Sequence, residues 1–297
     1  METLDGGQAF RWRRLVQGDS PAVAFEGRWG RHVVRLRQSA ENSDLEASLP
    51  DGVDEAAELS AILSYLSLDH PSVKAVDALP YRSDAVLARA LSAYRGLRIL
   101  AQPFGEALFC FMCSATKRID QIKIICETVA ERFGERLADG SHALPTWKVL
   151  ATVGEDRLRA CQLGYRARYI AQSAAFLAER PGWLDQVYAL PAAEAREALQ
   201  LLPGVGEKIA DCTLLFGAGR LEVFPIDTWI NQVMERLYGL QDWKKAQLQT
   251  FAKVHFGAYA GYAQQVLFAY VREQARSRAH GAKLKGTPQD FGSTNHS

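Results

Sequence analysis

The sequence predicts an α+β protein that is predominantly α-helical and carries a small antiparallel β-sheet near its N-terminus. Two patterns support this fold class. Between residues 56 and 276, apolar side chains recur at helical spacing, and short turns with Pro, Gly or Asp separate many of the segments. Ahead of them, residues 25–29 and 32–37 have the β-branched, aromatic or alternating character of short strands. The 297 residues are enough for two domains and a sizeable core.

These patterns divide the chain into three parts. Residues 1–95 should hold the sheet and the first helices, 96–275 a helical body, and 276–297 a basic tail that we expect to be disordered. Residues 41–58 carry seven acids and no base, which predicts a surface loop and the start of a helix. The helices expected beyond residue 80 are 83–94, 104–113, 119–133, 147–153, 155–163, 167–179 and 192–201.

The composition excludes several classes of protein. The net charge of +1 does not indicate a nucleic-acid-binding protein, so any basic surface must be local. No apolar run is long enough to span a bilayer and no signal peptide is visible, so we expect an intracellular protein, which we take to be a monomer. The odd number of cysteines predicts reduced thiols in the core; they are Cys110, Cys113, Cys126, Cys161 and Cys212.

Arginines dominate the predicted strands. Seven of them lie between residues 11 and 37, and only Asp19 and Glu26 oppose them. Two interpretations stay open, namely the solvated outer face of a small sheet and a local basic surface.

Residues 199–216 predict two helices joined by a tight hairpin, at about 195–217. Pro203 and Gly204 should end the first helix, because Pro forces its predecessor out of the α region and Gly accepts a positive φ. Gly206 allows a second turn, and a breaker-free helix follows. Backbone N–H groups at the start of that helix would be free to bind a phosphate group, with the helix dipole behind them.

Lys208, Cys212 and Asp227 are the candidate reactive residues. Lys208 lies in the first turn of the second helix, and Cys212 follows one turn later on the same face. Asp227 precedes apolar residues at helical spacing and should cap the next helix. A desolvated Lys is a nucleophile, and a carboxylate beside it can stabilise a cationic transition state. Taken singly, Lys208 and Asp227 would more simply be a surface lysine and a helix cap.

Four stretches together resemble the helix-hairpin-helix DNA glycosylase superfamily, and above all its eukaryotic-type 8-oxoguanine DNA glycosylase/AP lyases. They are the hairpin with the downstream Asp227, residues 4–12 (Leu-Asp-Gly-Gly-Gln-Ala-Phe-Arg-Trp), residues 164–169 (Gly-Tyr-Arg-Ala-Arg-Tyr) and residues 259–268 (Tyr-Ala-Gly-Tyr-Ala-Gln-Gln-Val-Leu-Phe). The resemblance covers nearly the whole chain. It implies a helix-hairpin-helix glycosylase body behind a small N-terminal antiparallel sheet.

The resemblance implies a role for each residue of a base pocket. Lys208 is the nucleophile, and Asp227 stabilises the developing positive charge. The carbonyl of Gly7 accepts the N7–H that only the oxidised purine carries, and a site that leaves such a buried acceptor unpaired with ordinary guanine discriminates strongly. The other pocket residues are Cys212 and Phe268, on the two faces of the base, and Gln264, at its Watson–Crick edge.

The resemblance also implies contacts with the rest of the DNA. Tyr165 wedges beside the orphan base, and Arg166 hydrogen-bonds to that base. The family has three consecutive Asn and then an Arg where this chain has Thr, Lys, Arg118 and Gln121, which weakens the polar reading of the opposite base and leaves Arg118 or Gln121 to fill the gap. At the hairpin, Gly204 and Gly206 approach a phosphate, and the carbonyls of Leu202 and Val205 hold a monovalent cation, K⁺ or Na⁺.

The implied activity is excision of 8-oxoguanine from double-stranded DNA, followed by strand cleavage through a Schiff base on Lys208. It needs no redox cofactor, and because no cysteine follows Cys212, the four-cysteine iron–sulfur cluster of some superfamily members is excluded. Near the pocket, Trp229 and Val271 stand where the family commonly has His and Asp. Two alternatives remain: a glycosylase for another damaged base, such as an alkylated one, and a non-catalytic module that contacts only phosphates.

Overall fold

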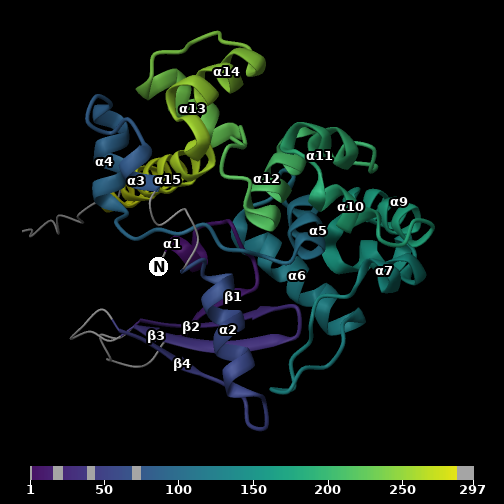
Figure 1. Cartoon of the computed structure of the whole chain (residues 1–297). Helices are drawn as coiled ribbons and strands as arrows, with labels where there is room; N and C mark the ends of the chain where they lie inside the picture. The colour runs from purple at the N-terminus through teal and green to yellow at the C-terminus, as the bar shows by residue number, and fades with distance from the viewer. Residues whose placement is uncertain (1, 16–22, 39–43, 69–74, 286–297) are drawn as a thin grey trace, which may run out of the picture.

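The computed structural model describes residues 2–15, 23–38, 44–68 and 75–285, with side chains as far as residue 277. Four strands form one antiparallel sheet in the order β1-β2-β3-β4 (Figure 1). The strands are β1 (Trp12–Leu15), β2 (Val23–Trp29), β3 (His32–Gln38) and β4 (Leu45–Ser48). The pair β2–β3 confirms the two predicted strands. Residues 45–48 correct the expected surface loop, because they pair with β3 although all four side chains are exposed.

An aromatic cluster joins the sheet to the helix α2 (Glu55–Tyr65), which lies across one of its faces (Figure 1). Trp29 stacks on Tyr65 with ring centroids 4.2 Å apart, and the indole N–H of Trp12 donates to the Tyr65 hydroxyl at 3.1 Å. Aromatic side chains bury much apolar area and keep one polar atom that needs a partner. The cluster therefore fixes α2 on the sheet through both packing and a buried hydrogen bond.

Glu26 of β2 gathers three of the strand arginines. Its carboxylate is buried and lies 3.0 Å from Arg13, 2.8 Å from Arg28 and 2.9 Å from Arg35. Burial opposes the charge of Glu26, but the guanidinium groups outweigh burial and lower its pKa. Arg28 also pairs with Asp139 of the helical body at 3.1 Å. The buried carboxylate therefore offsets part of the arginine charge of these strands, while the side chains of Arg13 and Arg35 stay exposed.

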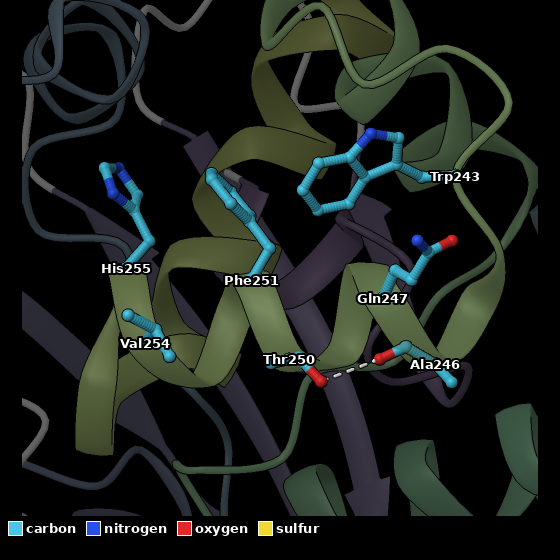
Figure 2. Close-up of a pocket in the computed structure, with 7 residues that line it drawn as sticks. All are labelled: Trp243, Ala246, Gln247, Thr250, Phe251, Val254 and His255. Atoms are coloured by element: carbon cyan, nitrogen blue, oxygen red, sulfur yellow. Dashed lines mark hydrogen bonds between the residues drawn. The ribbon is translucent and has the colours of Figure 1, made fainter.

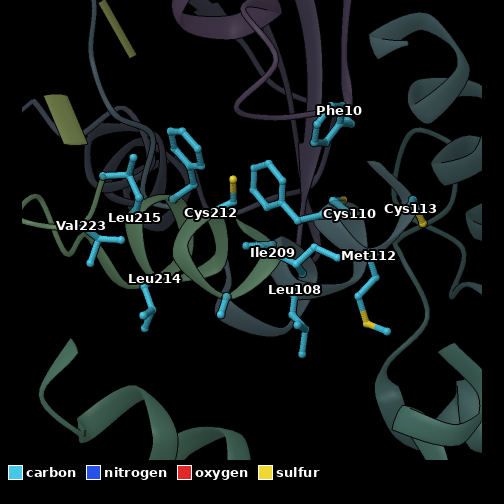
Figure 3. Packing of buried hydrophobic residues seen from close by; sticks show 14 of the residues in the cluster. Phe10, Leu108, Cys110, Met112, Cys113, Ile209, Cys212, Leu214, Leu215 and Val223 are labelled. Carbon is cyan, nitrogen blue, oxygen red and sulfur yellow. The ribbon is translucent and has the colours of Figure 1, made fainter. Parts of the chain in front are cut away.

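The helices α5 and α12 pack against each other at the centre of the body (Figures 1 and 3). A Cβ atom on Gly217 of α12 would lie 2.9 Å from the Cβ of Ala107 on α5, so this glycine permits the close approach. The helices of the body and the N-terminal arm are α1 (Glu2–Asp5), α3 (Ala75–Ala78), α4 (Ala85–Ala93), α5 (Phe104–Ser114), α6 (Ile119–Phe133), α7 (Trp147–Val153), α8 (Glu155–Leu158), α9 (Arg166–Ala178), α10 (Trp183–Ala189), α11 (Ala192–Leu199), α12 (Glu207–Ala218), α13 (Thr228–Leu237), α14 (Lys245–His255) and α15 (Ala260–Lys285).

The structure differs from the sequence-based expectation in three places. The helices α10 and α14 were not predicted. The expected helix 155–163 is α8 followed by a π-helical turn, Arg159–Leu163, in which Gln162 has a φ of 63°. The helix α15 continues to Lys285, so the expected disorder does not begin at residue 276; residues 286–297 lie outside the described part. Among the described helices, none combines the length and the apolar character needed to cross a bilayer.

Candidate active site

The hairpin between α11 and α12 has the predicted geometry. Gly204 has a φ of 80°, and a Cβ atom there would lie 2.6 Å from the ring of Tyr169, so only glycine fits against α9. Arg196 of α11 pairs with the buried Asp211 of α12 at 2.5 Å. Burial raises the pKa of Asp211, and the guanidinium opposes that rise. The ion pair fixes the two helices of the hairpin to each other.

The first turn of α12 is open at its N-terminus. Gly206 is the N-cap residue, and it has no side chain that could accept a hydrogen bond from the first N–H groups of α12. No atom lies within 4 Å of the place where a Cβ of Gly206 would be. Unpaired N–H groups with the helix dipole behind them form a site for an anion. The carbonyl of Leu202 accepts a hydrogen bond from the N–H of Val205 at 3.1 Å, which leaves its second lone pair for another ligand.

Lys208 projects from this turn toward α5. Its Nζ atom donates to the Oγ atom of Ser114 at 3.1 Å and lies 5.3 Å from the ring centroid of Phe111. Cys212 lies one turn further along α12 and is buried. Burial raises the pKa of the Cys212 thiol to about 11, while the nearby Lys208 opposes that rise. The lysine is half-buried, with a hydroxyl and an aromatic face beside its amine.

Asp227 caps α13, as the sequence predicts. Its Oδ1 atom accepts the N–H of Ile230 at 2.8 Å. Burial raises the pKa of Asp227, and the bond from Ile230 and the charge of Lys208 oppose this rise. Asp227 also raises the pKa of Cys212 by its charge. Lys208, Cys212 and Asp227 therefore lie close enough together for the charges of Lys208 and Asp227 to act on the Cys212 thiol and for the charge of Lys208 to act on Asp227.

The N-terminal arm, residues 2–11, carries Gly7 into the helical body. Gly7 has a φ of 91°, and a Cβ there would lie 2.7 Å from Cδ1 of Ile119. The buried Gln8 side chain holds the arm, because its Oε1 atom accepts the N–H of Leu100 at 2.9 Å. The ring of Phe10 packs on Phe111 with centroids 5.6 Å apart. Gly7 and Lys208 therefore approach the same part of the core, since Lys208 also lies over Phe111.

Gln264 and Phe268 share one face of α15, as their spacing predicts. The start of this helix packs on α12, because a Cβ on Gly261 would lie 2.5 Å from Cδ1 of Leu215. Gln264 is buried, and its Oε1 atom has no partner among the described residues. Arg272 lies one turn beyond Phe268, with its guanidinium carbon 5.6 Å from the Phe268 ring centroid. Arg272, four residues before the expected basic tail, is buried beside the predicted pocket.

The two residues predicted to contact the orphan base differ in their exposure. Tyr165 is 52% exposed and free to insert into a duplex. Arg166 is only 4% exposed, and its guanidinium donates to the carbonyls of Leu163 and Ala115 and to the hydroxyl of Thr116. In this structure Arg166 therefore holds the loop after α5 instead of facing outward. Its guanidinium carbon lies 4.4 Å from the ring centroid of Tyr165.

Arg118 and Gln121 lie at the start of α6. The Oε1 atom of Gln121 accepts the N–H of Arg118 at 3.1 Å, and the exposed guanidinium of Arg118 pairs with Asp120 at 2.7 Å. Thr116, ahead of them, has a φ of 53°, which is unusual for a β-branched residue. This loop is partly exposed and lies beside Tyr165 through the Arg166 contacts.

A pocket of about 610 Å³ lies on α14, apart from these residues (Figure 2). Trp243, Phe251 and His255 line it, and none of its lining residues comes from α12, α15 or the N-terminal arm. It contains neither Lys208 nor Asp227. We therefore place the candidate active site at the start of α12 and not in this pocket.

Comparisons with known proteins identify the family of the chain. A family model described as "HhH-GPD superfamily base excision DNA repair protein" matches residues 109–255, and one described as "8-oxoguanine DNA glycosylase, N-terminal domain" matches residues 1–108. The N-glycosylase/DNA lyase OGG1 of Arabidopsis thaliana is 30% identical over 284 residues, which cover 90% of this chain and 75% of that protein. The N-glycosylase/DNA lyase of Saccharomyces cerevisiae is 30% identical over 311 residues, with coverages of 90% and 81%.

A solved structure extends the likeness to the fold. The Clostridium acetobutylicum 8-oxoguanine glycosylase/lyase, in complex with double-stranded DNA containing cytosine opposite to 8-oxoguanine, superimposes with a TM-score of 0.82 at 29% identity. The match covers 92% of this chain and 91% of that chain. The chain therefore belongs to the HhH-GPD superfamily of base excision DNA repair proteins.

Proposed function

We propose that the protein is a bifunctional DNA glycosylase/AP lyase that excises 8-oxoguanine from double-stranded DNA. One observation carries this proposal: the amine of Lys208, in the first turn of α12, donates to Ser114 inside the body while its charge acts on both Asp227 and Cys212, and the N-terminus of this helix is open to a phosphate. A lysine in that position serves covalent chemistry, whereas a module that only contacts phosphates needs the hairpin alone. The named relatives and the structural neighbour carry the same pair of activities.

The reaction begins with the uncharged amine of Lys208, which attacks C1′ of the flipped nucleotide. The C1′–N9 bond breaks, its electron pair leaves with the base, and the base takes up a proton. The negative charge of Asp227 stabilises the positive charge that develops on the sugar. The attached nitrogen loses a proton, and its electron pair then forms an iminium link to C1′ while the C1′–O4′ bond breaks and O4′ takes up a proton. A proton leaves C2′, and the 3′ phosphate departs by β-elimination. Water finally hydrolyses the imine and releases Lys208.

The pocket residues would supply the choice of base. The Gly7 carbonyl accepts the N7–H of the oxidised purine and is left without a partner by ordinary guanine. The unpaired Oε1 atom of Gln264 is an acceptor for N–H groups on the Watson–Crick edge of guanine. Phe268 and Cys212 would cover the two faces of the ring, as extruded bases require. Both discriminating acceptors are therefore carried by elements other than the helix that holds Lys208.

The hairpin would bind the DNA backbone next to the flipped nucleotide. The open N–H groups after Gly206 suit a phosphate, and the free lone pair of the Leu202 carbonyl, with the carbonyl of Val205, suits K⁺ or Na⁺. Such a cation would brace the phosphate contact and take no part in the bond changes. We place the protein with the cell's DNA, in an intracellular compartment and as a monomer.

Borohydride trapping tests the proposal. Duplexes that carry a single 8-oxoguanine, alkylated purine or ordinary guanine, opposite each base in turn, are incubated with the protein and reduced. We expect a covalent adduct with 8-oxoguanine only, and none with Lys208→Gln, which should still bind the duplex. Lys253→Gln, a change of an exposed lysine on α14, is the matched control and should trap like the parent.

Three outcomes would redirect the proposal. Adducts that form only with alkylated purines would make the protein a related glycosylase with another substrate. Binding without any adduct would make it a non-catalytic reader of DNA. An adduct that persists in Lys208→Gln through the same peptide would remove Lys208 as the nucleophile.

A further inference from the structure

Arg272 occupies an unusual place for an arginine, in the middle of α15. It is 5% exposed and continues the row of Gln264 and Phe268 along one face of α15, at successive steps of four residues. Its Nη2 atom donates to Oε2 of Glu2 at 2.6 Å and to the carbonyl of Asp5 at 3.3 Å. The guanidinium therefore lies between α15 and the arm that carries Gly7.

Only part of the guanidinium is satisfied by these contacts. The Nη1 and Nε atoms are buried, and the described residues offer neither of them a hydrogen-bond partner. A buried N–H group without an acceptor costs roughly 1–3 kcal/mol, and more when the group is charged. Nearly all buried polar groups in proteins are paired, so two free donors on one buried arginine call for a partner from outside the described chain.

The position of Nη1 indicates what that partner is. It lies 3.5 Å from the place where a Cβ of Gly7 would be, and the guanidinium carbon lies 5.6 Å from the ring centroid of Phe268. Gly7 and Phe268 are the residues that the proposed function sets against N7 and the face of the base. In 8-oxoguanine, N7 carries a hydrogen, and carbonyl oxygens lie on either side of it, O8 on the next atom and O6 across the ring fusion.

We propose that Arg272 is a specificity-determining residue that donates a hydrogen bond from its unpaired nitrogens to a carbonyl oxygen flanking N7, while the Gly7 carbonyl accepts the N7–H. This inference rests on the proposed function. The pair reads an alternating donor and acceptor edge that only an oxidised purine presents in full, because ordinary guanine has neither the N7–H nor O8. The contact with Glu2 holds the guanidinium in place from its other side.

Equilibrium binding to uncleavable duplexes tests the inference. The duplexes carry 2′-fluoro-8-oxoguanine, 2′-fluoroguanine or a tetrahydrofuran abasic site, and the ratio of their affinities is the readout. We expect Arg272→Met to lower the preference for 8-oxoguanine over the abasic site by roughly 10- to 100-fold, the value of one hydrogen bond to a charged donor. Arg272→Lys, which keeps the charge opposite Glu2 but has one nitrogen in place of a fork, should lose most of the same preference.

Two further measurements separate recognition of the base from anchoring of the N-terminal arm and identify the oxygen that Arg272 contacts. Glu2→Gln removes the charge that pairs with Arg272. If its only effect is on the N-terminal arm, it should lower the affinity for all three duplexes by a similar factor. A duplex with 8-oxoadenine, which has O8 and N7–H but an amino group at C6, identifies the oxygen. A loss on Arg272→Met as large as that with 8-oxoguanine assigns the contact to O8, and a much smaller loss assigns it to O6.

The results distinguish failure of this inference from failure of the proposed function. If the unaltered protein does not prefer 8-oxoguanine over guanine, the proposed function fails. If it does, and both Arg272 variants keep the parent's preference for 8-oxoguanine over the abasic site, then Arg272 does not read the base. If both variants lose affinity for all three duplexes by the same factor, Arg272 only anchors the N-terminal arm. Thermal melting of each variant shows whether it is folded, and Arg272→Lys keeps the test valid if Arg272→Met is not.

Discussion

The carboxylate of Asp227 serves two purposes. One oxygen caps α13 through the N–H of Ile230, while the charge of the group faces Lys208. The two purposes respond differently to substitution, because a cap needs an oxygen acceptor and the proposed transition state needs a negative charge. This residue can therefore be used to separate folding from chemistry.

We expect Asp227→Asn to keep the stability of the protein and to lower the rate of base release by roughly 10²-fold or more, because the amide oxygen still accepts the Ile230 N–H but carries no charge. Asp227→Ala should lose the rate and, in addition, about 1 kcal/mol of stability with the cap. Single-turnover excision and urea unfolding measure the two effects. Equal stability loss in both variants would contradict the division of roles.

Tyr165 offers a second test at a single side chain. Its ring is exposed and rests on the guanidinium of Arg166. Stacking on a base is worth roughly 1–3 kcal/mol, so Tyr165→Ala should weaken binding to an abasic duplex by about 5- to 100-fold. Tyr188→Ala removes another exposed ring, one on α10, and should leave this affinity near that of the parent. Fluorescence anisotropy with the same duplex compares them.

Residues differ in how far the sequence alone could place them. Lys208, Cys212 and Asp227 were predictable, because helical spacing and capping are local rules. Arg166 and Arg272 were not, because their burial depends on partners far along the chain: Ala115 for the first and Glu2 for the second. A buried arginine and a surface arginine have the same local sequence pattern, so only the fold distinguishes them.

Among the elements, the hairpin shows how two neighbouring glycines can have different duties. Gly204 is held at positive φ against Tyr169, whereas Gly206 has a φ of −90° and open space around it. The first is required by packing and the second, in our proposal, by the approach of a phosphate.

The two glycines therefore predict opposite phenotypes. Gly204→Ala should destabilise the protein by roughly 1–3 kcal/mol, because the methyl group meets a ring and the backbone is strained. Gly206→Ala should change stability little but weaken binding to any duplex, because the new methyl group lies where the phosphate would approach. Urea unfolding and a salt titration of DNA affinity measure the pair. Equal stability of the two variants would contradict this assignment.

The elements that the sequence did not predict share a weak local pattern. The strand β4 has four exposed side chains and exists through its ladder with β3. The helix α14 buries only Leu248 and Ala252, too few for a clear apolar stripe. By contrast, α5 was predictable because its apolar run is continuous, and the hairpin because Pro and Gly act on the backbone directly.

At the scale of the whole molecule, Glu106 connects the sheet to the helical body. Its carboxylate, on α5, accepts the N–H of Gly30 in the β2–β3 turn at 2.8 Å. Burial raises the pKa of Glu106 to about 7, while the bond from Gly30 and the charge of Arg11 oppose that rise. The folded protein therefore holds this proton more tightly than the unfolded chain does.

Stability should consequently fall as the pH rises from 4.5 through about 7, because the proton is lost first from the unfolded chain and the buried charge then opposes folding. Glu106→Gln should remove this dependence and keep the Gly30 contact. Its advantage over the parent should be small at pH 5 and grow to at most roughly 3 kcal/mol above pH 7. Urea unfolding at pH 5 and pH 8 measures it, with Glu131→Gln, an exposed change on α6, as the control. An advantage that does not vary with pH would contradict the assignment.

The N-terminal arm offers a route by which such enzymes could change the damaged base that they accept. In our proposal, recognition of the lesion depends on a segment of about ten residues that precedes the sheet, while bond breaking depends on a hairpin nearly two hundred residues later. Phe10 of the arm and Lys208 both contact Phe111, and Arg272 of α15 contacts the arm. Chimaeras that exchange the N-terminal arm between relatives should therefore alter which damaged base is accepted and leave the steps that break the bonds unchanged.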